Sequence, residues 1–201
     1  MPLVNPYCAV ADIRAELSDA DSKLSEALIE KAISAASRAV DKHTGRRFWP
    51  DPAPTVRAYK TTGCSTVRVH DISTLTGLVV KTDPAGDGSW ATTWAASDYQ
   101  MEPLNADADG GSYAWWDIVS LLGAFPAARR RPSLQVTARF GWSQVPDQVT
   151  EATILKAVGL FRRKDAPFGV AGFGEFGAIR ITREDADVVD LLAPFRRVVL
   201  A

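Results

Sequence analysis

Hydrophobic positions near both ends of the chain repeat at the spacing of amphipathic helices. Val10, Ile13 and Leu17 predict a short first helix. A longer repeat predicts a second helix, and Gly45 follows it as the expected C-terminal stop. The apolar stripe expected on this second helix contains Leu24, Leu28, Ala32, Ala36 and Val40, with Ile29 and Ile33 beside them.

Two further helices are predicted in the C-terminal third of the chain. The first begins at "VPDQVTEA", because Pro146 suits a first helical turn, and ends near Pro167 and Gly169, which do not continue a helix. The second runs from Glu184 to about Ala193, where the apolar residues again share one face.

The middle of the chain changes to the alternating pattern of β-strands. The segments "TVRAYKTT", "STVRVHD", "TGLVVKTD" and "SLQVTARFGW" predict separate strands, and glycine-rich turns lie between other parts of this region. We therefore expect an α+β protein with a mainly helical core, made of three helices plus a C-terminal helix. In this prediction residues 1–50 and 141–201 form the core with a C-terminal arm, and residues 51–140 form a β-rich insertion.

Composition excludes several classes of function. Hydrophobic residues make up 46% and charged residues 23% of 201 residues, which is typical of a folded soluble domain. The net charge of −1 provides no global attraction to DNA or to an acidic membrane. No apolar run approaches the roughly 18 residues that span a bilayer, and the N-terminus lacks the pattern of a signal peptide.

Reactive residues are few and are not arranged in a known catalytic or metal-binding pattern. Two cysteines and two histidines lie far apart in sequence, so we expect no metal site, no cofactor and no catalytic residues. The run "GFGEFG", residues 172–177, matches the glycine spacing of a dinucleotide site. Such a site needs a strand before the glycines and a helix after them, whereas here a helix precedes and "AIRIT" follows. A nucleotide-binding enzyme is therefore a distant alternative.

Arginines form four short clusters, and three of these clusters follow or end predicted helices. Cations are locally favourable at a helix C-terminus, which explains much of the pattern. Contacts to phosphates or to another protein are the alternatives. The clusters contain Arg46 and Arg47, Arg129 to Arg131, Arg162 to Lys164, and Arg196 and Arg197.

The order of these elements and three motifs resemble the head-to-tail connector proteins, or adaptors, of phages with long non-contractile tails (siphoviruses). The motifs are "TGRRF" after the second helix, "FGWSQVPDQV" entering the third and "FRRKDAPFG" leaving it. The similarity covers both helical ends, and the β insertion matches less specifically.

This resemblance implies a structural virion protein made in the bacterial cytoplasm and located at the neck between head and tail. Such proteins form a homo-oligomeric ring, typically of twelve copies, that docks beneath the portal and extends the DNA channel. The partners implied are the portal, the next neck or tail protein, such as a stopper or tail terminator, and genomic DNA that passes without sequence recognition; no membrane is implied. A stopper or tail-completion protein is the alternative within the same class, and a sequence-specific DNA-binding protein is disfavoured by the charge balance.

The resemblance also suggests contact residues. Candidate portal or inter-subunit contacts are Phe168, Phe173, Phe176, Arg180, Phe195, Arg196 and Arg197. Candidate subunit contacts at helix ends are Arg46, Arg47, Arg162 and Arg163, and candidate channel or phosphate contacts are Arg129, Arg130 and Arg131. The tryptophans of the insertion are expected in its core, with contact to a neighbouring ring as the alternative.

Overall fold

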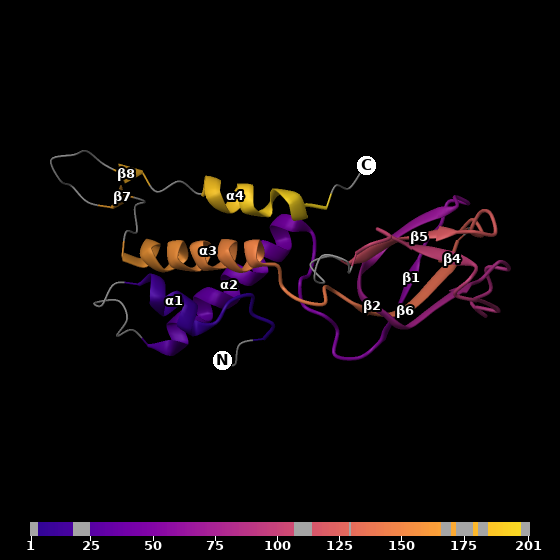
Figure 1. Ribbon diagram of the computed structural model, residues 1–201, viewed down its shortest axis with the longest axis horizontal. Coiled ribbons are helices and arrows are strands. Elements are labelled where there is room, and N and C mark those ends of the chain that lie inside the picture. Colours follow the sequence, from indigo (N-terminus) through magenta and orange to yellow (C-terminus); the bar gives the residue numbers. More distant parts are fainter. Residues whose placement is uncertain are drawn as a thin grey trace. The chain divides into compact units, whose positions relative to one another are not determined.

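The chain forms two compact units, which are described here separately (Figure 1). The computed structural model describes residues 4–17, 25–106, 114–128, 130–165, 170–171, 179–180 and 185–197. The helical unit is built from the described parts of 1–46 and 145–201, and the β unit from those of 47–144.

The helical unit contains α1 (Val10–Glu16), α2 (Glu26–Thr44), α3 (Asp147–Asp165) and α4 (Ala186–Leu192). A 3-10 turn (Ala193–Phe195) follows α4, and two short strands, β7 (Val170–Ala171) and β8 (Ile179–Arg180), lie between α3 and α4. The helix α3 packs against both α2 and α4 (Figure 1). The positions of the first three predicted helices are confirmed, and the fourth begins slightly later than predicted, with Asp185 as its N-cap.

The buried face of α2 differs from the predicted stripe. It is centred on Ile29, Ile33, Ala36 and Val40, whereas Leu28 is exposed and Ala32 only half-buried. This face also includes two polar residues, Ser37 and Thr44, whose hydroxyl groups donate to backbone carbonyls one turn earlier. Because these hydroxyls are satisfied within the helix, they cost little to bury. The buried stripe of α2 is therefore centred on the side of the helix that carries Ile29, whereas the predicted stripe was centred on the side that carries Leu28.

The β unit contains a six-stranded antiparallel sheet. Its strand order is β1-β6-β2-β5-β4, and β3 pairs with β2. The strands are β1 (Thr55–Tyr59), β2 (Thr66–Thr82), β3 (Thr92–Trp94), β4 (Tyr99–Glu102), β5 (Trp115–Ser120) and β6 (Leu134–Phe140).

The long strand β2 joins what the sequence pattern predicts as two strands. Its first part pairs mainly with β5 and its last part with β6 and β3, with irregular pairing between Thr74 and Val79. Gly77 lies in this irregular part with a φ of +78°, a conformation that favours glycine. One continuous strand with an irregular part therefore replaces the two separate strands that were predicted.

The β unit has a hydrophobic core of its own. Val67 and Val69 of β2, Ile118 of β5 and alternate residues of β6 are buried there. Of the five tryptophans expected in this core, Trp115 and Trp142 are buried, whereas Trp90, Trp94 and Trp116 are half-buried. The core expectation is therefore confirmed for Trp115, Trp94 packs against this core from its edge, and Trp142 is buried against Phe48.

The predicted fold class needs correction. The protein is α+β, but a mainly helical core of three helices plus a C-terminal helix is wrong, because the described residues form a six-stranded antiparallel sheet beside the four helices. The physical reason is that the strand-rich segment buries its own apolar side chains and pairs its own backbone groups. It is a second folded unit, comparable to the helical one, with six strands in its sheet.

The two ends of the β unit lie against each other. The ring of Phe48 packs on that of Trp142 with centroids 5.1 Å apart, and the N–H of Asp51 donates to the carbonyl of Phe140 at 2.7 Å. Gly141 has a φ of +114°, and a Cβ there would lie 2.7 Å from the carbonyl carbon of Trp49. The segment that leaves the unit after β6 therefore requires glycine where it passes the segment that enters before β1.

Candidate functional site

The predicted contact residue Arg46 lies at the end of α2 and is bonded within the helical unit. Gly45 ends the helix in the left-handed conformation, with a φ of +68°. The Arg46 Nε donates to the carbonyl of Phe195 at 2.9 Å, and the N–H of Arg197 donates to the carbonyl of Thr44 at 2.7 Å. Arg46 thus links the 3-10 turn that follows α4 to the end of α2.

Arg47 begins the β unit and forms an internal ion pair. Its Nη2 lies 2.6 Å from Asp51 Oδ1 and donates to the carbonyl of Phe140 at 3.0 Å. Its guanidinium lies 4.0 Å from the centroid of the Trp49 ring. The buried Asp51 carboxylate also accepts from the hydroxyl of Thr55 at 2.8 Å. This arrangement holds the entry and exit segments of the β unit together.

The remaining candidates, apart from Arg130 and Arg131, fall into four groups. Phe195 is buried in the helical unit, so its side chain packs in the fold. Arg196 is exposed and Arg197 half-buried. For Arg162 and Arg163, in the last turns of α3, and for Arg180, in β8, only the backbone is described. Phe168, Phe173, Phe176 and Arg129 lie outside the described residues.

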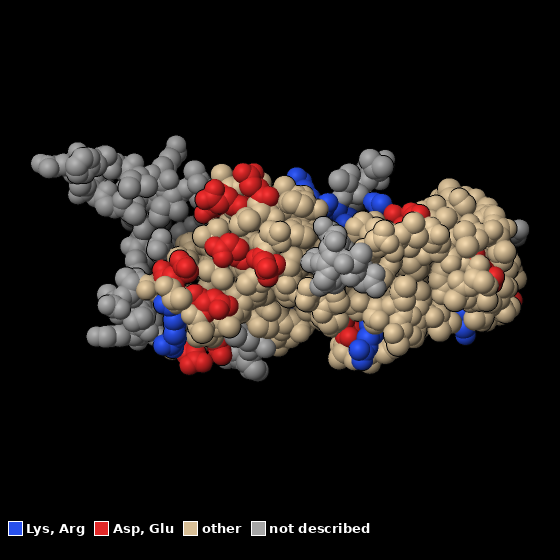
Figure 2. All heavy atoms as spheres, viewed as in Figure 1, with Lys and Arg blue, Asp and Glu red and all other residues tan. Residues whose placement is uncertain are grey.

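Arg130 and Arg131 are exposed on the β unit. The Arg131 Nη1 donates to the carbonyl of Asp87 at 3.0 Å, which links two loops of that unit. In the view of Figure 2, acidic side chains gather over α3 and α4 on the helical unit, whereas the face shown of the β unit carries few charges. The acidic face does not favour phosphate contacts.

The "GFGEFG" run lies outside the described residues, but its flanks are described. Before it, β7 pairs antiparallel with β8 after it, with Val170 opposite Arg180 and Ala171 opposite Ile179. The run therefore joins two strands. A dinucleotide site would instead need a strand before the glycines and a helix after them.

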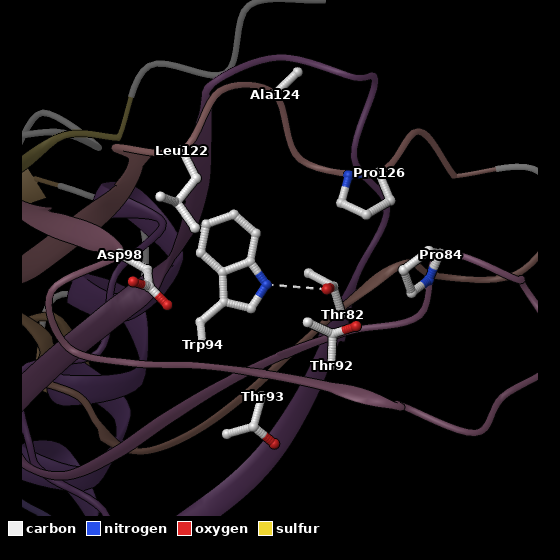
Figure 3. Close-up of a pocket in the computed structure, with 9 residues that line it drawn as sticks. All are labelled: Thr82, Pro84, Thr92, Thr93, Trp94, Asp98, Leu122, Ala124 and Pro126. Carbon is white, nitrogen blue, oxygen red and sulfur yellow. Dashed lines mark hydrogen bonds between the residues drawn. The ribbon is translucent and has the colours of Figure 1, made fainter.

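A pocket of about 280 Å³ opens on the β unit beside β3 (Figure 3). Trp94 lies at its centre, donates its Nε1 hydrogen to Thr82 at 3.0 Å, and stacks on Phe125 with centroids 4.8 Å apart. Pro84, Asp98, Leu122 and Pro126 also line the pocket. The pocket is therefore preformed and mainly apolar, with one carboxylate on its wall.

Next to this pocket, the loop after β5 exposes two consecutive leucines. Leu121 is 58% and Leu122 71% exposed. Backbone hydrogen bonds hold both ends of the loop, since Leu121 donates to Asp98 at 2.9 Å and Phe125 donates to Cys64 at 3.0 Å. Sequence reasoning missed this surface. The "LLG" run directly after a strand could have indicated this surface, because Gly123 turns the chain there with a φ of +115°.

Within the described residues, no group of three or more His, Cys, Asp and Glu side chains is placed to hold a metal ion. Both cysteines are free: Cys8 is buried and Cys64 exposed. Burial raises the pKa of the Cys8 thiol to about 12, with a smaller contribution from Asp12, so this thiol is uncharged at neutral pH.

None of the helices described combines the length and apolar character needed to cross a bilayer.

No protein-family model matches the sequence, and no curated protein matches it. Solved structures share the fold. The first comes from the neck of an empty GTA particle computed with C6 symmetry: a chain there aligns with a TM-score of 0.59 and 17% identity, over 100% of this chain and 95% of its own length.

Two further matches come from native particles. In the neck of the native GTA particle computed with C12 symmetry, a chain aligns with a TM-score of 0.54 and 18% identity, over 96% of this chain and 90% of that one. In the virion of the native gene transfer agent (GTA) particle, the TM-score is 0.54 and the identity 19%, with the same coverage. This chain has their fold. At these identities the likeness shows the fold alone.

Proposed function

We propose that this chain is a structural neck protein of a phage-like particle, and that it is the adaptor that forms a ring beneath the portal. One observation carries this proposal: the fold is shared, over nearly the full length of both chains, with chains of GTA particle necks. The resemblance of "TGRRF", "FGWSQVPDQV" and "FRRKDAPFG" to connector proteins supports it independently.

The ring is proposed to contain twelve identical copies around the DNA channel, docked to the next neck or tail component on its other side. The C12 symmetry used for one of the similar necks supports this number. A closed ring of identical subunits needs two unlike lateral surfaces on each copy. In this proposal residues 1–50 and 141–201 are the connector core with its C-terminal arm, and residues 51–140 are the insertion.

The arm is the proposed portal contact, through the phenylalanines Phe168, Phe173 and Phe176 with Arg180, Arg196 and Arg197. Deleting residues 170–201 is an unsuitable test, because it removes Val188, Leu192 and Phe195 from the buried face of α4 and its following turn. Substituting Phe173→Ser and Phe176→Ser leaves those residues in place, and is therefore the better variant.

The test is electron microscopy of the full chain mixed with its cognate portal protein. We expect a ring of twelve copies on the portal, and we expect Phe173→Ser with Phe176→Ser to abolish docking without lowering the melting temperature. Leu104→Ser, an exposed change in the β unit, is the control and should dock normally. A ring found one layer below the adaptor position in whole particles would instead indicate a stopper, and absence from the neck would reject the proposal.

A further inference from the structure

Two unlike apolar surfaces lie toward opposite ends of the β unit. The first is the Trp94 pocket, which here means Trp94, Leu122, Pro84, Pro126 and Asp98. The second is the Leu75 end, which here means Pro54, Val56 and Leu75 with Arg139. Leu75 is 44% and Val56 59% exposed, so both surfaces present large apolar side chains to solvent.

The strand pairing places the Leu75 end in one part of the sheet. Val56 on β1 pairs with Thr137 on β6, and Thr137 also pairs with Val79 on β2, so the three form one row. Thr74, the neighbour of Leu75, pairs with Arg139. A Cβ at Gly77 would lie 3.9 Å from Cγ of Pro54, which brings the bend of β2 beside the start of β1.

The Trp94 pocket lies beside the other end of β6. Thr82, which accepts the hydrogen bond of Trp94, pairs with Leu134 at the start of β6. Arg139, at the Leu75 end, is five positions further along this strand. At the rise of an antiparallel strand this separation is roughly 17 Å. A single contact between two copies can therefore use the pocket of one and the Leu75 end of the other.

Charge at the two surfaces is complementary. Asp98 is the acidic residue on the wall of the pocket, as drawn in Figure 3. Arg139 is exposed at the Leu75 end, where its Nη2 donates to the carbonyl of Pro52 at 2.8 Å. A carboxylate on one surface and a guanidinium on the other favour the unlike pairing over pairing of either surface with itself.

We propose that the Trp94 pocket of one copy receives the Leu75 end of the next copy, and that this contact repeats around the ring. The inference rests on the proposed function for its occupant, a second copy of this chain. Rotational symmetry of C12 and C6 in the necks that share the fold supports a repeated contact between copies. The contact is heterologous, as a ring with more than two members requires. Each copy in a closed ring is held on two sides, so a contact that is weak between two free copies is sufficient within the ring.

Disulfide trapping tests this pairing with the full chain. In a Cys64→Ser background, one protein carries Leu75→Cys and another carries Leu122→Cys. Each substitution is at an exposed position, and the remaining Cys8 is buried. Under mild oxidation at high concentration, we expect a cross-linked dimer in the mixture at a rate at least about tenfold above that of either protein alone, because only the mixture brings the two surfaces together.

Leu104→Cys provides the matched control. Leu104 is 63% exposed on the same unit but belongs to neither surface. Mixed with either test protein, it should cross-link only at the background rate. Equal rates in all mixtures, or no cross-linking at all, would overturn the proposed pairing.

A second pair of variants keeps the test independent of cysteine chemistry. Leu75→Asp and Leu122→Asp should each weaken self-association in sedimentation by about tenfold or more, since each removes a large apolar group from the contact. Unchanged association of both would also overturn the pairing. A ring seen on the portal without specific cross-linking would reject this contact and leave the proposed function standing. Specific cross-linking in a protein that is absent from the neck would do the reverse.

Discussion

At the scale of single residues, Arg47 shows how the structure changes the meaning of a motif. The arginine pair in "TGRRF" suggests a cationic contact for another molecule. In the folded chain the Arg47 guanidinium instead lies against Asp51, the carbonyl of Phe140 and the ring of Trp49. The sequence could not reveal this, because Phe140 lies 93 residues away. An arginine bonded in this way is less available to a partner.

Arg47→Ala should therefore destabilise the β unit. It leaves Asp51 buried without its nearest cation, and Arg57, at 3.8 Å, compensates only in part. We expect a loss of about 2–3 kcal/mol in the free energy of unfolding, below the range for fully buried pairs because Arg47 is partly exposed. Urea unfolding measures it. Arg68→Ala, which removes an exposed pair with Asp117, is the control and should cost about 1 kcal/mol or less. Equal losses would show that the Arg47 pair is not structural.

At the scale of elements, local patterns predicted helices better than strands. The helix α2 was predicted from apolar spacing and a terminal glycine, both of which act within a few residues. The sheet depends on pairing between distant segments. Sequence alone predicted β1 and β6 but divided β2 into two strands, because the alternating pattern is interrupted between Asp71 and Thr76, where the structure continues the strand with irregular pairing. The short strands β3, β4 and β5 were not predicted individually.

The helix α4 is seven residues long, so its stability depends on packing. Leu192 is 1% exposed, whereas Leu191 beside it is half-buried. Leu192→Ala should therefore cost about 2–3 kcal/mol and detach α4 locally from α3. Hydrogen exchange should show faster exchange of α4 amides with α2 amides unchanged. Leu191→Ala, the matched control, should have a clearly smaller effect. The prediction fails if exchange rises equally throughout the helical unit.

At the scale of the whole molecule, the division into two units is what the sequence pattern described least well. In place of one helical core with an insertion, the described residues form a hydrophobic core in each unit. The pattern located the change of character near residues 50 and 140. It could not show that Phe48 and Trp142, just outside that segment, pack on each other and belong with the sheet.

We predict that residues 47–144 fold on their own. The fragment keeps the sheet, the Arg47–Asp51 pair and the contact between Phe48 and Trp142. Thermal unfolding followed by circular dichroism should show a cooperative transition. The shorter fragment 51–140 should melt at a lower temperature, by about 10 °C or more, because it lacks two large buried aromatic rings. If both fragments melt alike, the end contacts do not stabilise the unit.

The meeting of the two ends of the β unit also has a consequence for inheritance. A folded unit whose first and last residues lie side by side can be replaced by another such unit. The replacement leaves unchanged the distance between the two points where the unit joins the rest of the chain. One recombination event on each side of codons 47 to 144 would give a protein with the same helices and a different β unit. The steric requirement at Gly141, where the returning strand passes Trp49, marks one place where such an exchange must be matched on both sides.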